Sequence, residues 1–128
     1  MKSGREHRVP LSKPVLAVLE ELRLHQPESA DFVFPGNGKA RHLSNMALTV
    51  LLRRMERSDI TVHGFRSSFR DWASEETGYS REVAEMALAH TLKDKTEAAY
   101  RRDDLFVKRA AMMADWATFC AKLPDGGA

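Results

Sequence analysis

The sequence has one cysteine, Cys120, and lacks any long apolar run. A single cysteine excludes an internal disulfide and is typical of proteins from a reducing compartment. No apolar stretch approaches the roughly 20 residues that a helix needs to cross a bilayer. The polar segment from Met1 to Arg8 also lacks the apolar centre of a secretory signal. These absences predict a cytoplasmic protein that does not span a membrane.

Spacing typical of metal ligands is absent as well. His7, His25 and His42 stand alone, and the Asp and Glu residues are scattered along the chain without forming a cluster. The sequence therefore predicts no metal and no cofactor, and it disfavours a metal-dependent nuclease more than any other class considered.

What is present is typical of a globular domain with a basic bias. The 128 residues are 43% hydrophobic and 30% charged, which is ordinary for one domain with a real core. The net charge of +2 does not by itself indicate nucleic acid, but thirteen of the twenty basic residues are arginine. Arginine binds phosphate oxygens through a planar fork, so the bias fits a phosphodiester partner and fits a solvated surface equally well.

The hydrophobic periodicity predicts a mainly α fold with a small β component. Short strands are expected at His7–Leu11 and Phe32–Phe34, the first at a sheet edge because Pro10 lacks an N–H donor. Helices are expected over 12–25 with Ser12 as the N-cap, from about 44 to 55, from 63 towards Gly78, from Ser80 to His90, over a short piece ending near 100, and over 105–122. Residues 1–123 are predicted to form the domain and residues 124–128 a disordered tail.

Two apolar stripes predict where the helices pack. Phe65, Phe69, Trp72 and Ala73 fall on one face of the helix that follows His63. The last helix carries a second stripe, from Met112 to Cys120, in which the cysteine is expected to act as a small buried hydrophobe. This second stripe fits packing within the chain or docking on a partner helix, and the sequence does not separate the two.

Candidate chemistry begins at His63-Gly-Phe-Arg66. The tetrapeptide lies at a predicted helix start, where free N–H groups and the helix dipole favour an anion and Arg66 can add a bidentate clamp. For the tetrapeptide in isolation, a purely structural interpretation is favoured, with His63 as a cap and Arg66 in an ion pair.

His90 and Tyr100 are the other candidates. His90 follows a helix end, where a histidine more often interacts with the helix dipole. Tyr100 precedes two arginines, which favour the phenolate, although an ordinary tyrosine pKa near about 10 makes a poor nucleophile. Taken alone, Tyr100 fits a half-buried amphipathic contact better than a nucleophile.

Together these residues resemble the tyrosine recombinases, in particular the phage-type integrases of prophages and genomic islands. The order is H-x-x-R, then His90, then Tyr100, and the strings from Val62 to Glu75, Leu88-Ala89-His90 and Ala99 to Arg102 are similar to those integrases. The segment from Lys2 to Leu11 resembles the hairpin that supplies the active-site lysine of the family. The resemblance extends to about Lys122.

The resemblance implies DNA strand cleavage and rejoining at specific sites, without metal or ATP. Tyr100 would attack a phosphodiester and form a 3′-phosphotyrosyl intermediate, while Lys2 would protonate the leaving 5′-oxygen. Arg66, His63 and His90 would bind the phosphate, with His63 also suited to accept a proton. The implied partners are double-stranded DNA and other recombinase protomers.

The first catalytic arginine of the family has no counterpart in this sequence, since Lys2 is the second residue. We therefore expect an N-terminally truncated C-terminal portion of the catalytic domain with weak or no activity. The alternative is a non-catalytic remnant that binds DNA or a partner recombinase. Type IB topoisomerases and telomere resolvases share the chemistry, but the strings around His63 and His90 favour an integrase.

Overall fold

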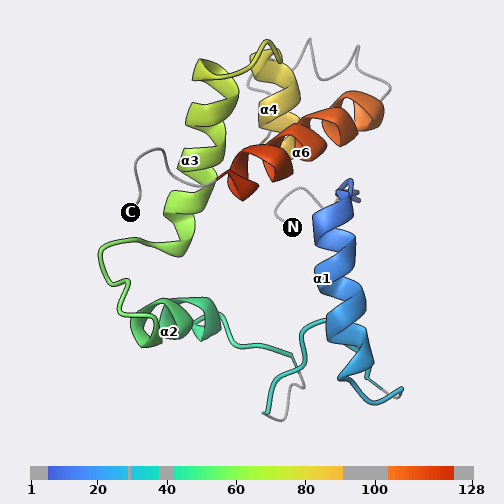
Figure 1. The fold of residues 1–128 in the computed structure, drawn as a ribbon, viewed down its shortest axis with the longest axis vertical. Coiled ribbons are helices and arrows are strands. Elements are labelled where there is room, and N and C mark those ends of the chain that lie inside the picture. The colour runs from blue at the N-terminus through green and yellow to red at the C-terminus, as the bar shows by residue number, and fades with distance from the viewer. Residues whose placement is uncertain (1–5, 29, 38–41, 91–103, 123–128) are drawn as a thin grey trace. The chain divides into compact units, whose positions relative to one another are not determined.

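The computed structural model describes residues 6–28, 30–37, 42–90 and 104–122, and Figure 1 shows them as a ribbon. Within these ranges the chain is mainly helical, as predicted. The helices are α1 (Lys13–Leu24), α2 (Ala47–Arg54), α3 (Val62–Glu75), α4 (Arg81–Ala87) and α6 (Phe106–Ala121). Each of them falls within or close to a predicted range, and none is long and apolar enough to cross a membrane.

The chain forms two compact units. One contains Met1–Val15 and Phe69–Ala128, and the other contains Leu16–Ser68. Helices α1 and α3 each begin in one unit and end in the other. Each unit is described below by itself.

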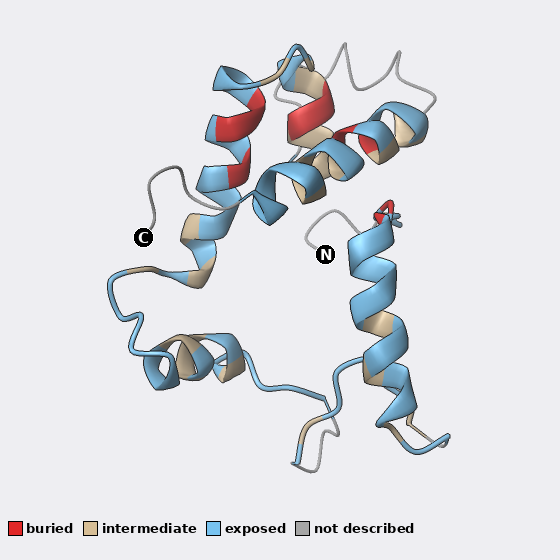
Figure 2. Ribbon diagram, in the orientation of Figure 1, coloured by how far each residue is buried: buried red, intermediate tan, exposed pale blue. Residues whose placement is uncertain are grey.

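The buried core belongs to the first unit. It forms where the C-terminal half of α3 meets α4 and α6, and the buried positions of the three helices appear in red in Figure 2. Its members are Phe69, Trp72, Ala73, Val83, Ala84 and Met112. Trp116 extends the core, because its ring lies 5.0 Å from the Trp72 ring and meets the Phe69 ring edge-on at 5.3 Å. The stripe of the last helix therefore packs within the chain over this part of its length.

Helix ends are determined by local hydrogen bonds. Ser80 caps α4 as predicted, since its hydroxyl accepts a hydrogen bond from the Val83 amide. Helices α2 and α4 both end in Schellman turns, with Glu56 (φ 57°) and Ala89 (φ 56°) in the left-handed position that usually holds glycine. Neither turn was predicted, because neither contains that glycine.

The second unit has little buried surface among its described residues. Neither α1 nor α2 contains a buried residue. The β component described here is a single antiparallel bridge between Pro35 and His42. A Cβ at Gly36 would lie 2.2 Å from the His42 carbonyl oxygen, so only glycine permits this close approach.

Several packing predictions were wrong. Neither His7–Leu11 nor Phe32–Phe34 forms a strand, because the described residues supply no second strand for either segment. Phe65 is 55% exposed although it shares a helix with Phe69, and Cys120 is exposed near the end of α6. Residues 124–128, predicted as a tail, lie outside the described residues.

The core makes a direct prediction about stability. Met112 is fully buried on α6, whereas Val107 on the same helix is 82% exposed. We expect Met112→Ala to lower the free energy of unfolding by about 2–5 kcal/mol, since it removes apolar contacts and leaves a cavity. Val107→Ala is the control and should change it by less than about 0.5 kcal/mol. Urea unfolding followed by circular dichroism measures both, and equal effects would contradict this description of the core.

Candidate active site

The first candidate pair stands at the start of α3. Thr61 caps this helix, because its hydroxyl accepts a hydrogen bond from the Gly64 amide at 3.0 Å. His63 and Arg66 are the second and fifth residues of α3, and both are exposed. Positions three apart lie on one face of a helix, so the two side chains are neighbours beside the free N–H groups of the first turn. The predicted helix start is confirmed, whereas the cap at Thr61 was missed.

His90 stands just beyond the end of α4, and Glu85 holds it in two ways. The His90 amide donates to the Glu85 carbonyl oxygen at 2.9 Å, which is the long hydrogen bond of the Schellman turn. The ring Nδ1 lies 2.5 Å from Oε2 of the Glu85 side chain. The imidazole is thus attached to α4 through Nδ1, and Nε2 is the nitrogen that Glu85 does not engage.

Glu85 is a centre of charge in the first unit. Its Oε1 lies 2.9 Å from Arg70 Nη2 on α3 and 3.9 Å from Arg81 Nε, four residues earlier on α4. The Glu85 side chain is only 14% exposed, so these contacts are less screened by water than those of a surface pair. No signal in the sequence pointed to Glu85, since its role depends on an arginine of another helix.

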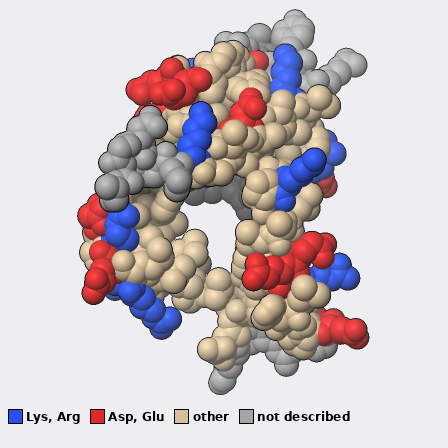
Figure 3. Space-filling view, viewed as in Figure 1, with Lys and Arg blue, Asp and Glu red and all other residues tan. Residues whose placement is uncertain are grey.

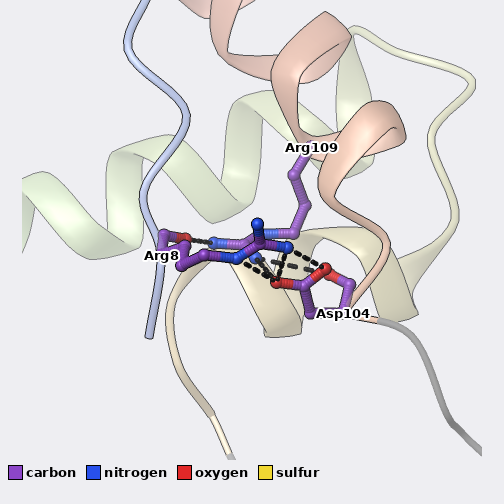
Figure 4. A network of polar contacts seen from close by, with 3 residues as sticks. All are labelled: Arg8, Asp104 and Arg109. Carbon is purple, nitrogen blue, oxygen red and sulfur yellow. Dashed lines mark hydrogen bonds and ion pairs between the residues drawn. The ribbon is translucent and has the colours of Figure 1, made fainter. Parts of the chain in front are cut away.

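A second charge network joins the N-terminal segment to the start of α6 (Figure 4). Arg8 donates hydrogen bonds to both carboxylate oxygens of Asp104, at 3.0 Å and 3.2 Å, and its guanidinium lies 4.5 Å from the centre of the Phe106 ring. Arg109 is 1% exposed and donates to the backbone carbonyls of Arg8 and Asp104. A cation on an apolar stripe was the one sequence signal for this network, and it was overlooked.

The network shifts two pKa values. Desolvation raises the pKa of Asp104, but the hydrogen bond and charge of Arg8, together with the charge of Arg109, outweigh desolvation and lower it below its ordinary value. Burial lowers the pKa of Arg109 against the opposing charge of Asp104, and a guanidinium remains protonated in spite of such a shift.

Tyr79 is engaged in a separate pair. Its hydroxyl donates to Asp115 Oδ2 at 2.5 Å, and this hydrogen bond, with desolvation and the charge of Asp115, raises the pKa of Tyr79 to about 12. The pair borders a hollow of about 590 Å³ between the end of α3 and α6.

On the face drawn in Figure 3, basic and acidic side chains are interspersed.

The structure describes three of the five candidate residues, and these three belong to two different units. His63 and Arg66 belong to the second unit and His90 to the first. Lys2 and Tyr100 lie outside the described residues. Among the residues that are described, no group of three or more His, Cys, Asp or Glu side chains is arranged to hold a metal ion.

The sequence model of the phage integrase family matches residues 1–105. The chain belongs to the phage integrase family. The resemblance to tyrosine recombinases is therefore confirmed at the level of the family, and the mainly helical fold agrees with a portion of their catalytic domain. All five candidate residues fall within the matched range.

Individual integrases are similar along most of the chain. The prophage integrase IntA of Escherichia coli (strain K12) is 36% identical over 131 residues, covering 99% of this chain and 30% of its own length. The prophage integrase IntZ of the same strain is 36% identical over 118 residues, covering 91% of this chain and 29% of its own length. The integrase of Enterobacteria phage P4 is 29% identical over 124 residues, with 93% and 28% covered. The chain thus spans less than a third of the length of these integrases, and no solved structure matches it.

The Arg8–Asp104–Arg109 network predicts how this integrase chain responds to acid. An aspartate in an unfolded chain titrates near about 3.9, and the pKa of folded Asp104 lies lower. The stability that its ionised carboxylate contributes is therefore complete above the unfolded pKa and is lost as the pH falls through the folded one. Asp104→Asn should unfold more easily at neutral pH and lose less stability in acid. Urea unfolding at a series of pH values measures this, with exposed Asp71→Asn as the control, and parallel curves for wild type and Asp104→Asn would contradict it.

The Tyr79–Asp115 pair predicts an alkaline titration. The chain has two tyrosines, so in a Tyr100→Phe variant the phenolate absorbance reports Tyr79 alone. We expect its midpoint at about 12, and a shift towards the ordinary value of about 10 when Asp115→Asn is added. Because the folded pKa is raised, the stability that the pair contributes is present below about pH 10 and is lost as the pH rises towards 12. A midpoint that Asp115→Asn leaves unchanged would contradict the hydrogen bond as its main cause.

Proposed function

We propose that residues 1–123 are the C-terminal part of a tyrosine recombinase catalytic domain that cleaves and rejoins double-stranded DNA at specific sites. The proposal rests on the order of His63-x-x-Arg66, His90 and Tyr100 within the range that matches the phage integrase family. Integration and excision of mobile DNA by assembled protomers in the cytoplasm is the corresponding biological role.

In the proposed reaction, the Tyr100 hydroxyl oxygen attacks the phosphorus of a phosphodiester. The bond to the 5′-oxygen breaks, the strand is held as a 3′-phosphotyrosyl ester, and Lys2 supplies the proton to the leaving 5′-oxygen. His63 accepts the tyrosine proton or donates to the phosphate. Arg66 binds non-bridging oxygens and stabilises their charge in the transition state, and His90 donates a further hydrogen bond. The reverse attack by a 5′-hydroxyl rejoins the strand, so neither metal nor cofactor is required.

The structure supports parts of this assignment. The capped start of α3 presents His63 and Arg66 beside free backbone N–H groups, an arrangement suited to an anion. Of the two tyrosines, Tyr79 donates a hydrogen bond to Asp115, and the raised pKa makes it a poor nucleophile. The proposal therefore assigns the attack to Tyr100, which lies outside the described residues.

We further propose that the 128-residue chain alone cleaves DNA slowly. No residue of the sequence can be assigned to the first arginine of the family, and removal of one preorganised donor to a transition state typically lowers the rate by about 10²–10³. The alternative function is that of a non-catalytic remnant that binds DNA or a partner recombinase.

Covalent capture of DNA distinguishes the two functions. Duplexes with randomised sequence and a nick in one strand release a short fragment after cleavage, so the phosphotyrosyl adduct accumulates and survives denaturation. We expect a slowly forming adduct whose modified tryptic peptide contains Tyr100. Tyr100→Phe should abolish it, since no other side chain replaces the nucleophile.

Tyr79→Phe is the matched control for this experiment, because it removes the only other tyrosine, and it should leave the adduct intact. An adduct on Tyr79, or one that survives Tyr100→Phe, would contradict the assignment. DNA binding without any adduct would favour the non-catalytic remnant.

A further inference from the structure

The two carboxylate oxygens of Glu85 have different partners. Oε1 faces cations, with Arg70 of α3 at 2.9 Å and Arg81 of α4 at 3.9 Å. Oε2 faces the His90 ring at 2.5 Å. With 14% of its side chain exposed, Glu85 is contacted on both oxygens, Oε1 by ion pairs without a hydrogen bond and Oε2 by the hydrogen bond to the ring, and it is less free to rotate than a surface glutamate. The ring of His90 is thus anchored to a fixed carboxylate.

This contact determines where the imidazole carries its proton. An ionised carboxylate accepts hydrogen bonds and donates none, so the Nδ1 that faces Glu85 must carry the hydrogen. Free histidine side chains in water favour the other neutral form, with the hydrogen on Nε2. Glu85 therefore selects the less common Nδ1–H form and leaves Nε2, on the far side of the ring, for a second partner.

The same residue also places the backbone of His90. The His90 amide donates to the Glu85 carbonyl oxygen at 2.9 Å across the Schellman turn, in which Ala89 has a φ of 56°. Backbone and side chain of Glu85 together restrict the position of the ring and its rotation. Restriction of both is what a functional histidine needs, because the direction of its hydrogen bond decides whether it meets the reacting group.

We propose that Glu85 is a positioning residue, which holds His90 in the Nδ1–H form and directs its Nε2 towards the bound DNA phosphate. Only one part of this inference, the contact with a DNA phosphate, rests on the proposed function. Once the ring is protonated, both nitrogens carry hydrogen, so Nδ1 keeps its bond to Glu85 while Nε2 donates to a phosphate oxygen. The charged group in contact with this ring is Glu85, and Glu85 in turn contacts Arg70 and Arg81.

The first experiment measures the ring itself and requires no DNA. Imidazole ¹⁵N shifts of the labelled 128-residue chain, with His90→Gln used to assign the His90 signals among the five histidines, report which nitrogen carries hydrogen. At a pH at which the ring is neutral, we expect the wild type to show the Nδ1–H form. Glu85→Ala should restore the Nε2–H form, and Glu85→Gln should give a mixture, since an amide both accepts and donates.

Glu75→Gln is the matched control, because it neutralises an exposed glutamate at the end of α3 and should leave the His90 signals unchanged. A wild-type ring in the Nε2–H form would overturn the inference. This test uses the wild type alone, so it remains valid even if the Glu85→Ala chain fails to fold. An unchanged ring in folded Glu85→Ala would overturn the inference as well.

The second experiment measures the consequence for the reaction with the nicked DNA duplexes. Glu85→Gln should slow formation of the phosphotyrosyl adduct by about tenfold to a hundredfold, the loss typical when a residue that orients a functional histidine is changed. In a His90→Gln background the same substitution should cause almost no further loss, because there is no ring left to position.

These two results separate the inference from the proposed function. If the Glu85→Gln and His90→Gln variants each slow adduct formation and their effects multiply in the double variant, Glu85 has a general structural role and the positioning role is overturned. The Nδ1–H form without any adduct in the wild type would contradict the proposed function and, with it, the phosphate contact, while the selection of the ring form by Glu85 would stand.

Discussion

The buried guanidinium of Arg109 is the constraint around which the first unit is organised. A charge with 1% exposure is costly unless its hydrogen bonds are satisfied and a counter-charge lies nearby. Here the backbone carbonyls of Arg8 and Asp104 accept hydrogen bonds from Nη2 and Nη1, the Asp104 carboxylate lies 3.6 Å from Nη1, and Nε has no hydrogen-bond partner among the described residues. The N-terminal segment therefore docks where it satisfies a cation that the α6 stripe would otherwise bury alone. Arg8 then closes the network through Asp104 and stacks on Phe106.

The strained start of α6 follows from the same arrangement. Leu105 has a φ of 53°, a conformation that is costly for a bulky side chain, and it lies between Asp104 and the first turn of the helix. Its side chain packs against the core around Met112, and the Arg109 amide donates to its carbonyl oxygen at 2.8 Å. The polar network on one side and the apolar core on the other hold this residue in place. Strain of this kind persists only where the surroundings over-determine it.

What could be predicted from the sequence is what depends on near neighbours along the chain. The helices were predicted because apolar spacing and a cap such as Ser80 act within a few residues. The predicted β strands were wrong because a strand needs a partner strand to pair with. The exposure of Phe65 was missed because periodicity shows which helix face is apolar but not which element, if any, packs against each residue of that face. Glu85 was missed for a similar reason, since its role depends on Arg70 from another helix. His63, Arg66 and His90 were proposed from the order of a family motif, which needs no geometry.

His63 and Arg66 stand at the start of α3, and His90 follows the end of α4, so the helix-dipole fields at the two places have opposite signs. The start of α3 is the positive end of the helix dipole, so the backbone beside His63 and Arg66 favours an anion. His90 stands at the negative end of α4, beside a carboxylate. There the backbone field opposes an anion, and His90 can contribute to phosphate binding only through a directed hydrogen bond. A directed bond depends on ring orientation far more than an electrostatic field does, so the proposed contact between His90 and a phosphate would depend on the ring orientation that Glu85 provides.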